Sequence, residues 1–110
     1  MPIKFVYTVP FLNDIRRLRK RYRLVVDDLD ALLAEMQDKD YRGAYVPGYD
    51  LAIYKVRLAN RSARRGKRGG FRAIYHPLDD HNFLFLHIYS KSDKGDVGAS
   101  EMRKLLRDLN

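Results

Sequence analysis

The chain has 110 residues, a length that fits one domain over residues 1–110 with one sheet and a few helices. It has no cysteine, which excludes a disulfide framework and a thiolate zinc site, and no apolar run approaches the ~18 residues that cross a membrane. The formal net charge of +8 favours a polyanionic partner: nucleic acid, an anionic membrane face or an acidic protein. With no signal-peptide pattern at the N-terminus, we expect a cytoplasmic protein.

The first third of the chain predicts a strand and two helices. Residues 3–9 are β-branched and aromatic, which is typical of a strand, and Pro10 ends the run. From Phe11 to Met36, apolar residues recur at alternating spacings of four and three, as in a helix. The pattern allows one long helix, but cations crowd residues 16–23 and acids crowd residues 27–40. A helical hairpin bending near residues 21–24 is more compact, and we predict the hairpin.

The rest of the chain predicts a loop, three strands and a last helix. Residues 41–50 contain two glycines and a proline and are typical of a loop. Strand-like runs follow at 51–59, 71–76 and 82–90, and Met102, Leu105, Leu106 and Leu109 share one face of a final helix. This order predicts an α+β fold, with helices on one face of a mostly antiparallel four-stranded sheet.

Residues 59–70 form a basic loop that contains glycines and no acid. The glycines allow a phosphate backbone to approach closely, so the loop would act as an electrostatic funnel toward the strand that follows. A run of charges is also typical of a solvated surface. The five cations of the loop are Arg61, Arg64, Arg65, Lys67 and Arg68.

Simple antiparallel pairing predicts a cationic row across three strands. It places Arg57 opposite Arg72, and Arg72 opposite His87, all on one face of the sheet. Opposed like charges destabilise a sheet, and phosphate is the natural ligand to neutralise them. A register error of one residue would scatter the row to both faces. Lys55 precedes Arg57 by two positions, and Lys91 follows the last strand.

Strict alternation also divides the last strand between two faces. Leu84, Leu86 and Ile88 would face the helices, while Phe85, His87 and Tyr89 would share the opposite, mixed face. An aromatic ring among cations, such as Tyr89, can stack on an unpaired base. Most of the eight tyrosines are better explained as packing residues.

The stretch IYKVRLANRSARRGKRGGFRAIYH, followed by FLFLHIYSKSDKGDV, resembles the RelE/HigB-like toxins of bacterial type II toxin–antitoxin modules, in the RelE/ParE superfamily. The likeness follows the whole chain in element order and is sharpest from Tyr54 to Asp96. It implies a RelE-like fold and an endoribonuclease that needs no metal or cofactor. Such a toxin cuts mRNA, often in the ribosomal A site, and so inhibits translation. The implied partner is a cognate antitoxin, and operator DNA would be bound only through the toxin–antitoxin complex.

The resemblance also implies roles for individual residues. Lys55 and Arg57 match basic strand residues that the family uses for RNA contact and catalysis, and Arg72 matches the arginine that holds the scissile phosphate. Lys91 falls near a basic residue that follows the last strand. Many family members carry a tyrosine further on, but the stretch DKGDVGAS has none. His87 and Tyr89 are the local candidates for its role.

RNA cleavage without a metal requires deprotonation of the 2′-OH, stabilisation of the charged phosphorane and protonation of the leaving 5′-oxygen. Arg72, assisted by Arg57, suits the second role because a guanidinium grips two phosphate oxygens. Lys55, Lys91 or His87 would transfer protons, although His87 is also explained as an ordinary sheet histidine. Two alternatives need no cleavage: a ParE-like inhibitor of DNA gyrase, and a basic nucleic-acid-binding module.

Overall fold

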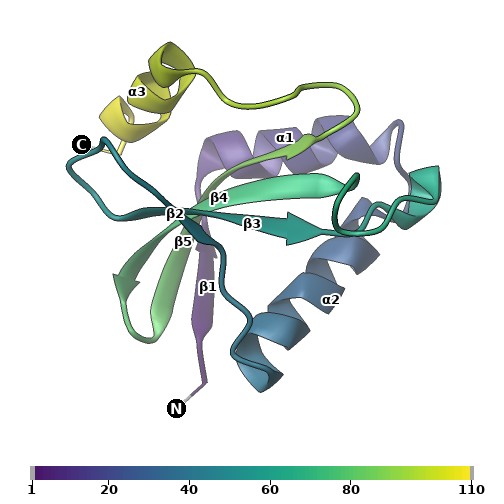
Figure 1. Cartoon of the computed structure of the whole chain (residues 1–110), viewed down its shortest axis with the longest axis horizontal. Coiled ribbons are helices and arrows are strands. Elements are labelled where there is room, and N and C mark those ends of the chain that lie inside the picture. Colours follow the sequence, from purple (N-terminus) through teal and green to yellow (C-terminus); the bar gives the residue numbers. More distant parts are fainter. Residues whose placement is uncertain (1, 110) are drawn as a thin grey trace.

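The fold is a five-stranded mixed sheet with helices on both faces, in a computed structural model that describes residues 2–109 (Figure 1). The strand order is β1-β5-β4-β3-β2; β1 pairs with β5 in parallel, and all other neighbours are antiparallel. The α+β class is confirmed, while the expected four-stranded sheet gains a fifth strand. The elements are β1 (Lys4–Tyr7), α1 (Val9–Arg19), α2 (Val25–Asp38), β2 (Ala44–Val46), β3 (Ile53–Leu58), the 3₁₀ turn η1 (Arg61–Ala63), β4 (Phe71–Asp79), β5 (Asn82–Ser90) and α3 (Ala99–Arg107).

The helical hairpin is confirmed, with α1 and α2 separated by residues 20–24. The Thr8 hydroxyl caps α1 by accepting a 3.2 Å hydrogen bond from the Phe11 N–H. Pro10 lies in the first turn of α1, where its missing N–H leaves no helical bond unmade, so it helps to begin the helix. It does not end the strand, because β1 stops at Tyr7 and Val9 already belongs to α1. Within residues 2–109, no helix is long and apolar enough to cross a membrane.

The strand that the sequence did not predict is β2, inside the expected loop 41–50. Its three residues pair with β3, with Ala44 opposite Lys55. The approach begins at Gly43, where an added Cβ would lie 2.4 Å from the Lys55 carbonyl oxygen. The glycine that indicated a loop is therefore what lets the backbone come alongside β3.

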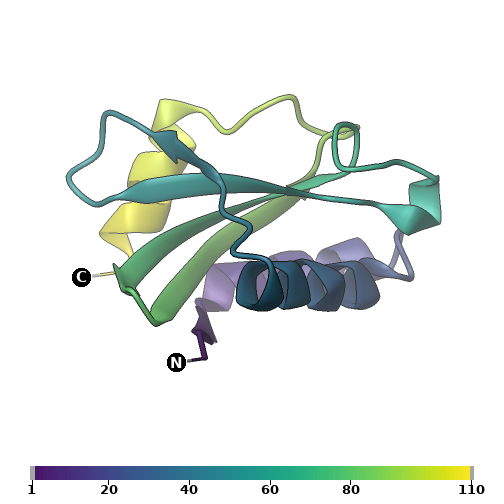
Figure 2. The ribbon, with the colours of Figure 1, turned by 60° about the horizontal axis from the view of Figure 1, so that its bottom comes forward.

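The two faces of the sheet carry separate apolar clusters, and this corrects the expectation that all helices share one face. Figure 2 shows α1 and α2 beneath the sheet and α3 on its other side. The larger cluster joins α1 and α2 to the sheet through side chains that include Phe11, Leu32, Met36, Val56, Phe71, Tyr75 and Phe85. The smaller cluster joins α3 to the opposite face through Met102, Ile53, Ile74, Leu86 and Tyr89.

A bulge in β5 changes which of its apolar residues face the α1–α2 hairpin and which face α3. Ile74 pairs with His87 but Tyr75 pairs with Phe85, so Leu86 is the extra residue. One extra residue exchanges the two faces along the rest of the strand. The predicted grouping of Leu84, Leu86 and Ile88 is therefore wrong: Phe83, Phe85 and Ile88 pack against the α1–α2 hairpin, whereas Leu84, Leu86 and Tyr89 pack on the side of α3.

Candidate nucleic-acid interface

Two arginines lie directly opposite each other on neighbouring strands. Arg57 of β3 pairs with Arg72 of β4, as the sequence predicted. Arg57 is exposed, and within residues 2–109 no acidic side chain forms an ion pair with either arginine. Burial, and then the nearby Arg57, lower the pKa of the Arg72 guanidinium from its ordinary value. The arrangement is an electrostatic cost that an anion would relieve.

Arg72 also holds the basic loop against the sheet. Its Nη1 donates to the carbonyls of Lys67 (2.8 Å) and Phe71 (3.2 Å), and its Nη2 donates to that of Arg68 (2.7 Å). The residue is only 6% exposed. A guanidinium has five N–H groups, so Nε and one Nη2 hydrogen are left without a partner in the described part of the chain. Arg72 can therefore support a bound anion while its other donors fix the loop.

The third member of the predicted row is Tyr89, not His87. Arg72 pairs with Tyr89, and His87, two residues earlier on β5, pairs with Ile74. The prediction assumed uniform pairing of β4 with β5 from His76 opposite Phe83. In the structure His76 pairs with Leu84, and the bulge adds one more residue, so the partner of Arg72 moves by two positions. His87 is buried, with Nδ1 2.6 Å from Asp14 Oδ2 and Nε2 3.3 Å from Glu101 Oε2.

Asp14 is a buried acid of α1 that sequence reasoning missed. Its carboxylate accepts hydrogen bonds from the His87 ring, from the Ile88 N–H at 3.1 Å and from Arg17 Nη2 at 2.6 Å. The available signal was its position, three residues after Phe11 and therefore on the buried side of the helix. These contacts fix the His87 ring against α1 rather than in the row with Arg57 and Arg72.

A carboxylate from the segment between β5 and α3 lies on the face of the sheet that carries Lys55 and Arg57. Asp96 Oδ1 lies 3.2 Å from Lys55 Nζ and accepts a 2.8 Å hydrogen bond from the Val97 N–H. The Tyr89 hydroxyl donates to the same oxygen at 3.5 Å. The Val97 N–H first, and then Lys55, hold the pKa of Asp96 below its usual range. Asp96 was not a predicted site residue, because it belongs to an irregular segment with no periodicity.

Tyr89 is poorly placed for stacking on an RNA base. It is 5% exposed, and its ring stacks on that of His87 with centroids 5.5 Å apart. Lys94 Nζ lies 5.6 Å from the ring centroid. Burial, and then the neighbouring Asp96, raise the pKa of the Tyr89 hydroxyl to about 12. Tyr89 therefore packs against other residues of the site and exposes little surface to a ligand.

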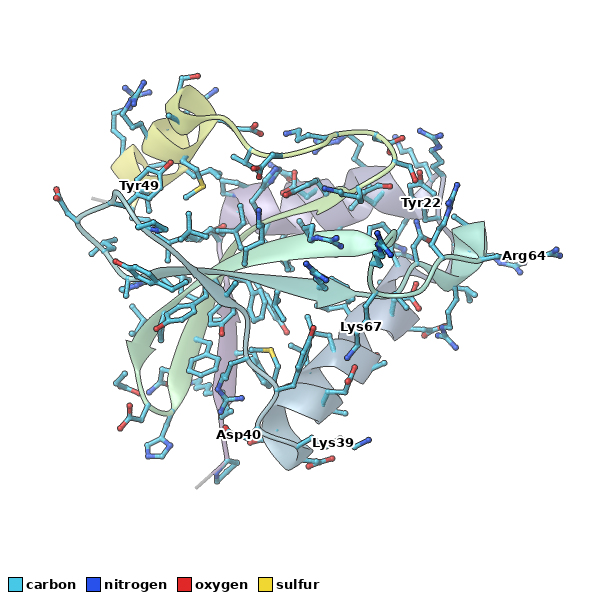
Figure 3. All side chains as sticks on the ribbon, in the orientation of Figure 1. Tyr22, Lys39, Asp40, Tyr49, Arg64 and Lys67 are labelled. Carbon is cyan, nitrogen blue, oxygen red and sulfur yellow. The ribbon has the colours of Figure 1, made fainter. Side chains whose placement is uncertain are left out.

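The five cations of the basic loop divide into two groups. Arg61 forms an ion pair with Asp28 (2.7 Å), and Lys67 forms one with Glu35 (2.6 Å). Two acids of α2 therefore tether the loop to that helix. The other three are exposed and have no acidic partner within the described residues: Arg64, Arg65 and Arg68. In Figure 3, Arg64 points outward from the tip of the loop, while Lys67 lies over α2.

The loop is more ordered than a flexible funnel. Arg64 has the left-handed φ of 55°, and Asn60 forms an isolated bridge with Arg65. At Gly70 an added Cβ would lie 2.2 Å from the Leu58 carbonyl oxygen, so the chain can close there only with glycine. The Lys91 N–H donates to the Gly70 carbonyl at 2.9 Å, which brings Lys91 beside the end of the loop. The glycines thus allow an ordered loop conformation in which several cations are exposed.

The described residues contain no group of three or more His, Asp or Glu side chains arranged to hold a metal ion. The site instead combines opposed arginines, an exposed basic loop, and the pair Lys55–Asp96 on one face of the sheet. A comparison of the chain with protein-family models finds no match.

Proposed function

We propose that the protein binds RNA on this cationic face and cuts it, as an endoribonuclease toxin of the RelE/HigB-like kind. The observation that carries the proposal is the Arg57–Arg72 pair. Like charges held opposite each other weaken a sheet, and here no acid of the described chain relieves them. A phosphodiester supplies the missing negative charge, and guanidinium groups match its oxygens in geometry.

The roles follow from exposure and free donors. Arg64, Arg65 and Arg68 attract the RNA backbone from solution, an effect that weakens with added salt. Arg57 then binds a non-bridging oxygen of the scissile phosphate, supported by the remaining donors of Arg72 and by the charge of Lys91. When the 2′-oxygen attacks phosphorus, negative charge grows on those oxygens. One well-placed donor of this kind contributes about 10²–10³-fold in rate.

The biological setting is part of the proposal. The substrate is mRNA on the ribosome, cleavage inhibits translation, and an antitoxin protein neutralises the activity. This setting rests on the resemblance of residues 54–96 to the toxin family, and the cationic face is consistent with an RNA substrate.

The experiment compares Arg57→Gln with Lys4→Gln. Both changes remove one exposed positive charge, but Lys4 lies on the edge strand β1, outside the cationic face. Arg57 is a better target than Arg72, because losing Arg72 would also release two loop carbonyls and that of Phe71. Each chain is induced in a bacterial host while mRNA 5′ ends are mapped. The purified chains are then incubated with ribosomes and mRNA.

We expect the wild-type chain and Lys4→Gln to produce new 5′ ends inside coding regions. We expect Arg57→Gln to cleave about 10²-fold more slowly. Growth arrest with intact messages would reject the nuclease and support a gyrase-type inhibitor. RNA binding without cleavage would leave a binding module.

A further inference from the structure

The segment that joins β5 to α3 brings one acid into a face that is otherwise cationic. Asp96 Oδ1 receives Lys55 Nζ, the Val97 N–H and the Tyr89 hydroxyl, all at 3.5 Å or less. The side chain of Asp96 is nevertheless 71% exposed, and its Oδ2 has no hydrogen-bond partner within residues 2–109. One oxygen of Asp96 is thus held in place, while the other has no partner among the described residues and lies near β3, the strand that carries Arg57.

We propose that Asp96 and Lys55 are the acid–base couple of the cleavage reaction, an inference that rests on the proposed RNA-cutting function. Asp96 Oδ2 takes the proton of the attacking 2′-OH, and Lys55 Nζ gives a proton to the leaving 5′-oxygen. Lys55 lies two residues before Arg57 on β3, so both side chains point to the same face of the sheet. The couple therefore lies next to the phosphate that Arg57 binds.

The histidine, the tyrosine and the second aspartate near the site are occupied or covered. His87 is buried, with its Nδ1 held by Asp14. The Tyr89 hydroxyl is buried under the same segment and is directed at Asp96. Asp93 is engaged by Arg21 at 2.6 Å and by the Tyr22 hydroxyl at 3.2 Å. Asp96 is left as an ionised acid with an open oxygen at this site.

The reaction balances without any other reactant. The 2′-oxygen forms a bond to phosphorus as its proton moves to Asp96, and the bond from phosphorus to the 5′-oxygen breaks as Lys55 protonates that oxygen. The products are a 2′,3′-cyclic phosphate and a 5′-hydroxyl end. Asp96 is then neutral and Lys55 is an amine. One proton crossing the 3.2 Å contact from Asp96 to Lys55 restores the starting ion pair.

The deciding variant is Asp96→Asn, which is nearly isosteric with the wild-type residue. Its amide oxygen can still accept from the Val97 N–H and from Lys55, so the segment stays in place. We expect the single-turnover rate of cleavage, measured on ribosome-bound mRNA, to fall about 10²–10⁴-fold. The affinity for RNA should not weaken, because a negative charge has been removed from beside the phosphate. This split between rate and affinity is not the signature of a merely structural residue.

Two further chains complete the test. Asp93→Asn removes a carboxylate from the same segment, at a position engaged by Arg21 and Tyr22, and should cleave at the wild-type rate if it stays folded. Asp96→Ala should be slow alone, and added sodium formate should restore part of its rate by supplying a carboxylate to the vacated space. This rescue keeps the test valid if the asparagine variant folds poorly.

Each outcome separates the two proposals. An Asp96→Asn chain that cuts as fast as the wild-type chain, or faster, would overturn the acid–base couple and leave the nuclease standing. It would mean that Asp96 only competes with phosphate for Lys55. A wild-type chain that does not cut RNA under any of these conditions would reject both proposals together. Products ending in a 3′-hydroxyl would contradict the couple, because they require attack by a nucleophile other than the 2′-oxygen.

Discussion

The two faces of one sheet are built from the same strands but differ in almost every property. In β3, Val56 and Leu58 are buried toward the α1–α2 hairpin, while Lys55 and Arg57 project to the other side. The hairpin covers its face with a continuous aromatic and aliphatic cluster. On the other side, α3 packs on Ile53 and Ile74, and Arg57 stays exposed. The face covered by the hairpin can stabilise the fold, while the other face carries cations that have no acidic partner among the described residues.

The largest expected effect comes from breaking the face that the hairpin covers. Phe85 is fully buried beside Phe11 and Tyr75, with ring centroids 5.5 and 5.4 Å away. Phe85→Ala should lower the free energy of unfolding by about 3–5 kcal/mol. Leu105→Ala, at a half-buried position of α3, should lower it by roughly 1 kcal/mol. Urea denaturation measures both, and equal losses would contradict the division between a stabilising face and a functional one.

An intermediate effect on the free energy of unfolding is expected at alkaline pH, from Tyr89 on the face of the sheet that carries Arg57. The pKa of Tyr89 is about 12 in the folded protein, against about 10 in an unfolded chain. Its contribution to stability is therefore full below pH 10 and is lost as the pH rises toward 12. A shift of this size corresponds to about 2–3 kcal/mol.

Tyr89→Phe isolates this contribution, because phenylalanine keeps the ring but has no proton to lose. Burial also raises the pKa values of Tyr7 and Tyr75, so the variant should flatten only part of the alkaline decline. Denaturant midpoints between pH 9 and pH 12 for the two chains give the comparison. Parallel curves would show that Tyr89 titrates as it does in an unfolded chain.

The smallest expected effect has the opposite sign. Arg57→Gln removes one of two opposed positive charges and should raise the free energy of unfolding by about 0.2–1 kcal/mol. The same variant should lose cleavage, so the site would carry a measurable trade-off between stability and function. Lys4→Gln, on the edge strand β1, is the control and should change stability little. A destabilised Arg57→Gln chain would show that the charge repulsion is already compensated.

Local patterns predicted the parts of this molecule that local forces determine. The four–three spacing of apolar residues predicted helix over residues 11–36, and the division of charge and compactness favoured the hairpin. The pairing across the basic loop correctly placed Arg57 opposite Arg72. The predictions failed where one residue or a distant contact decides. The extra residue Leu86 changes the partner of Arg72, and no periodicity announces such a bulge.

The site was predicted in outline but not in its pairings. Charge counting identified the basic loop, yet only the folded chain distinguishes Arg61, which pairs with Asp28, from Arg64, which has no acidic partner among the described residues. Asp96 reaches Lys55 across an irregular segment, a contact that neither spacing nor composition encodes. No pattern in the sequence indicated that α3 packs on the opposite face of the sheet from the hairpin. The periodicity of an amphipathic helix shows that the helix has an apolar side, but it does not show which surface that side packs against.

The parallel pairing of β1 with β5 sets the order in which the chain can fold. Lys4 to Tyr7 pair with Asn82 to Phe85, so the first strand has no neighbour on the ribosome until the last strand has been synthesised. At ordinary rates of translation that delay lasts on the order of several seconds. The α1–α2 hairpin can form early from local contacts, but Tyr89, which underlies the arginine pair, arrives late. A nascent chain therefore acquires its cationic face only near the end of its own synthesis.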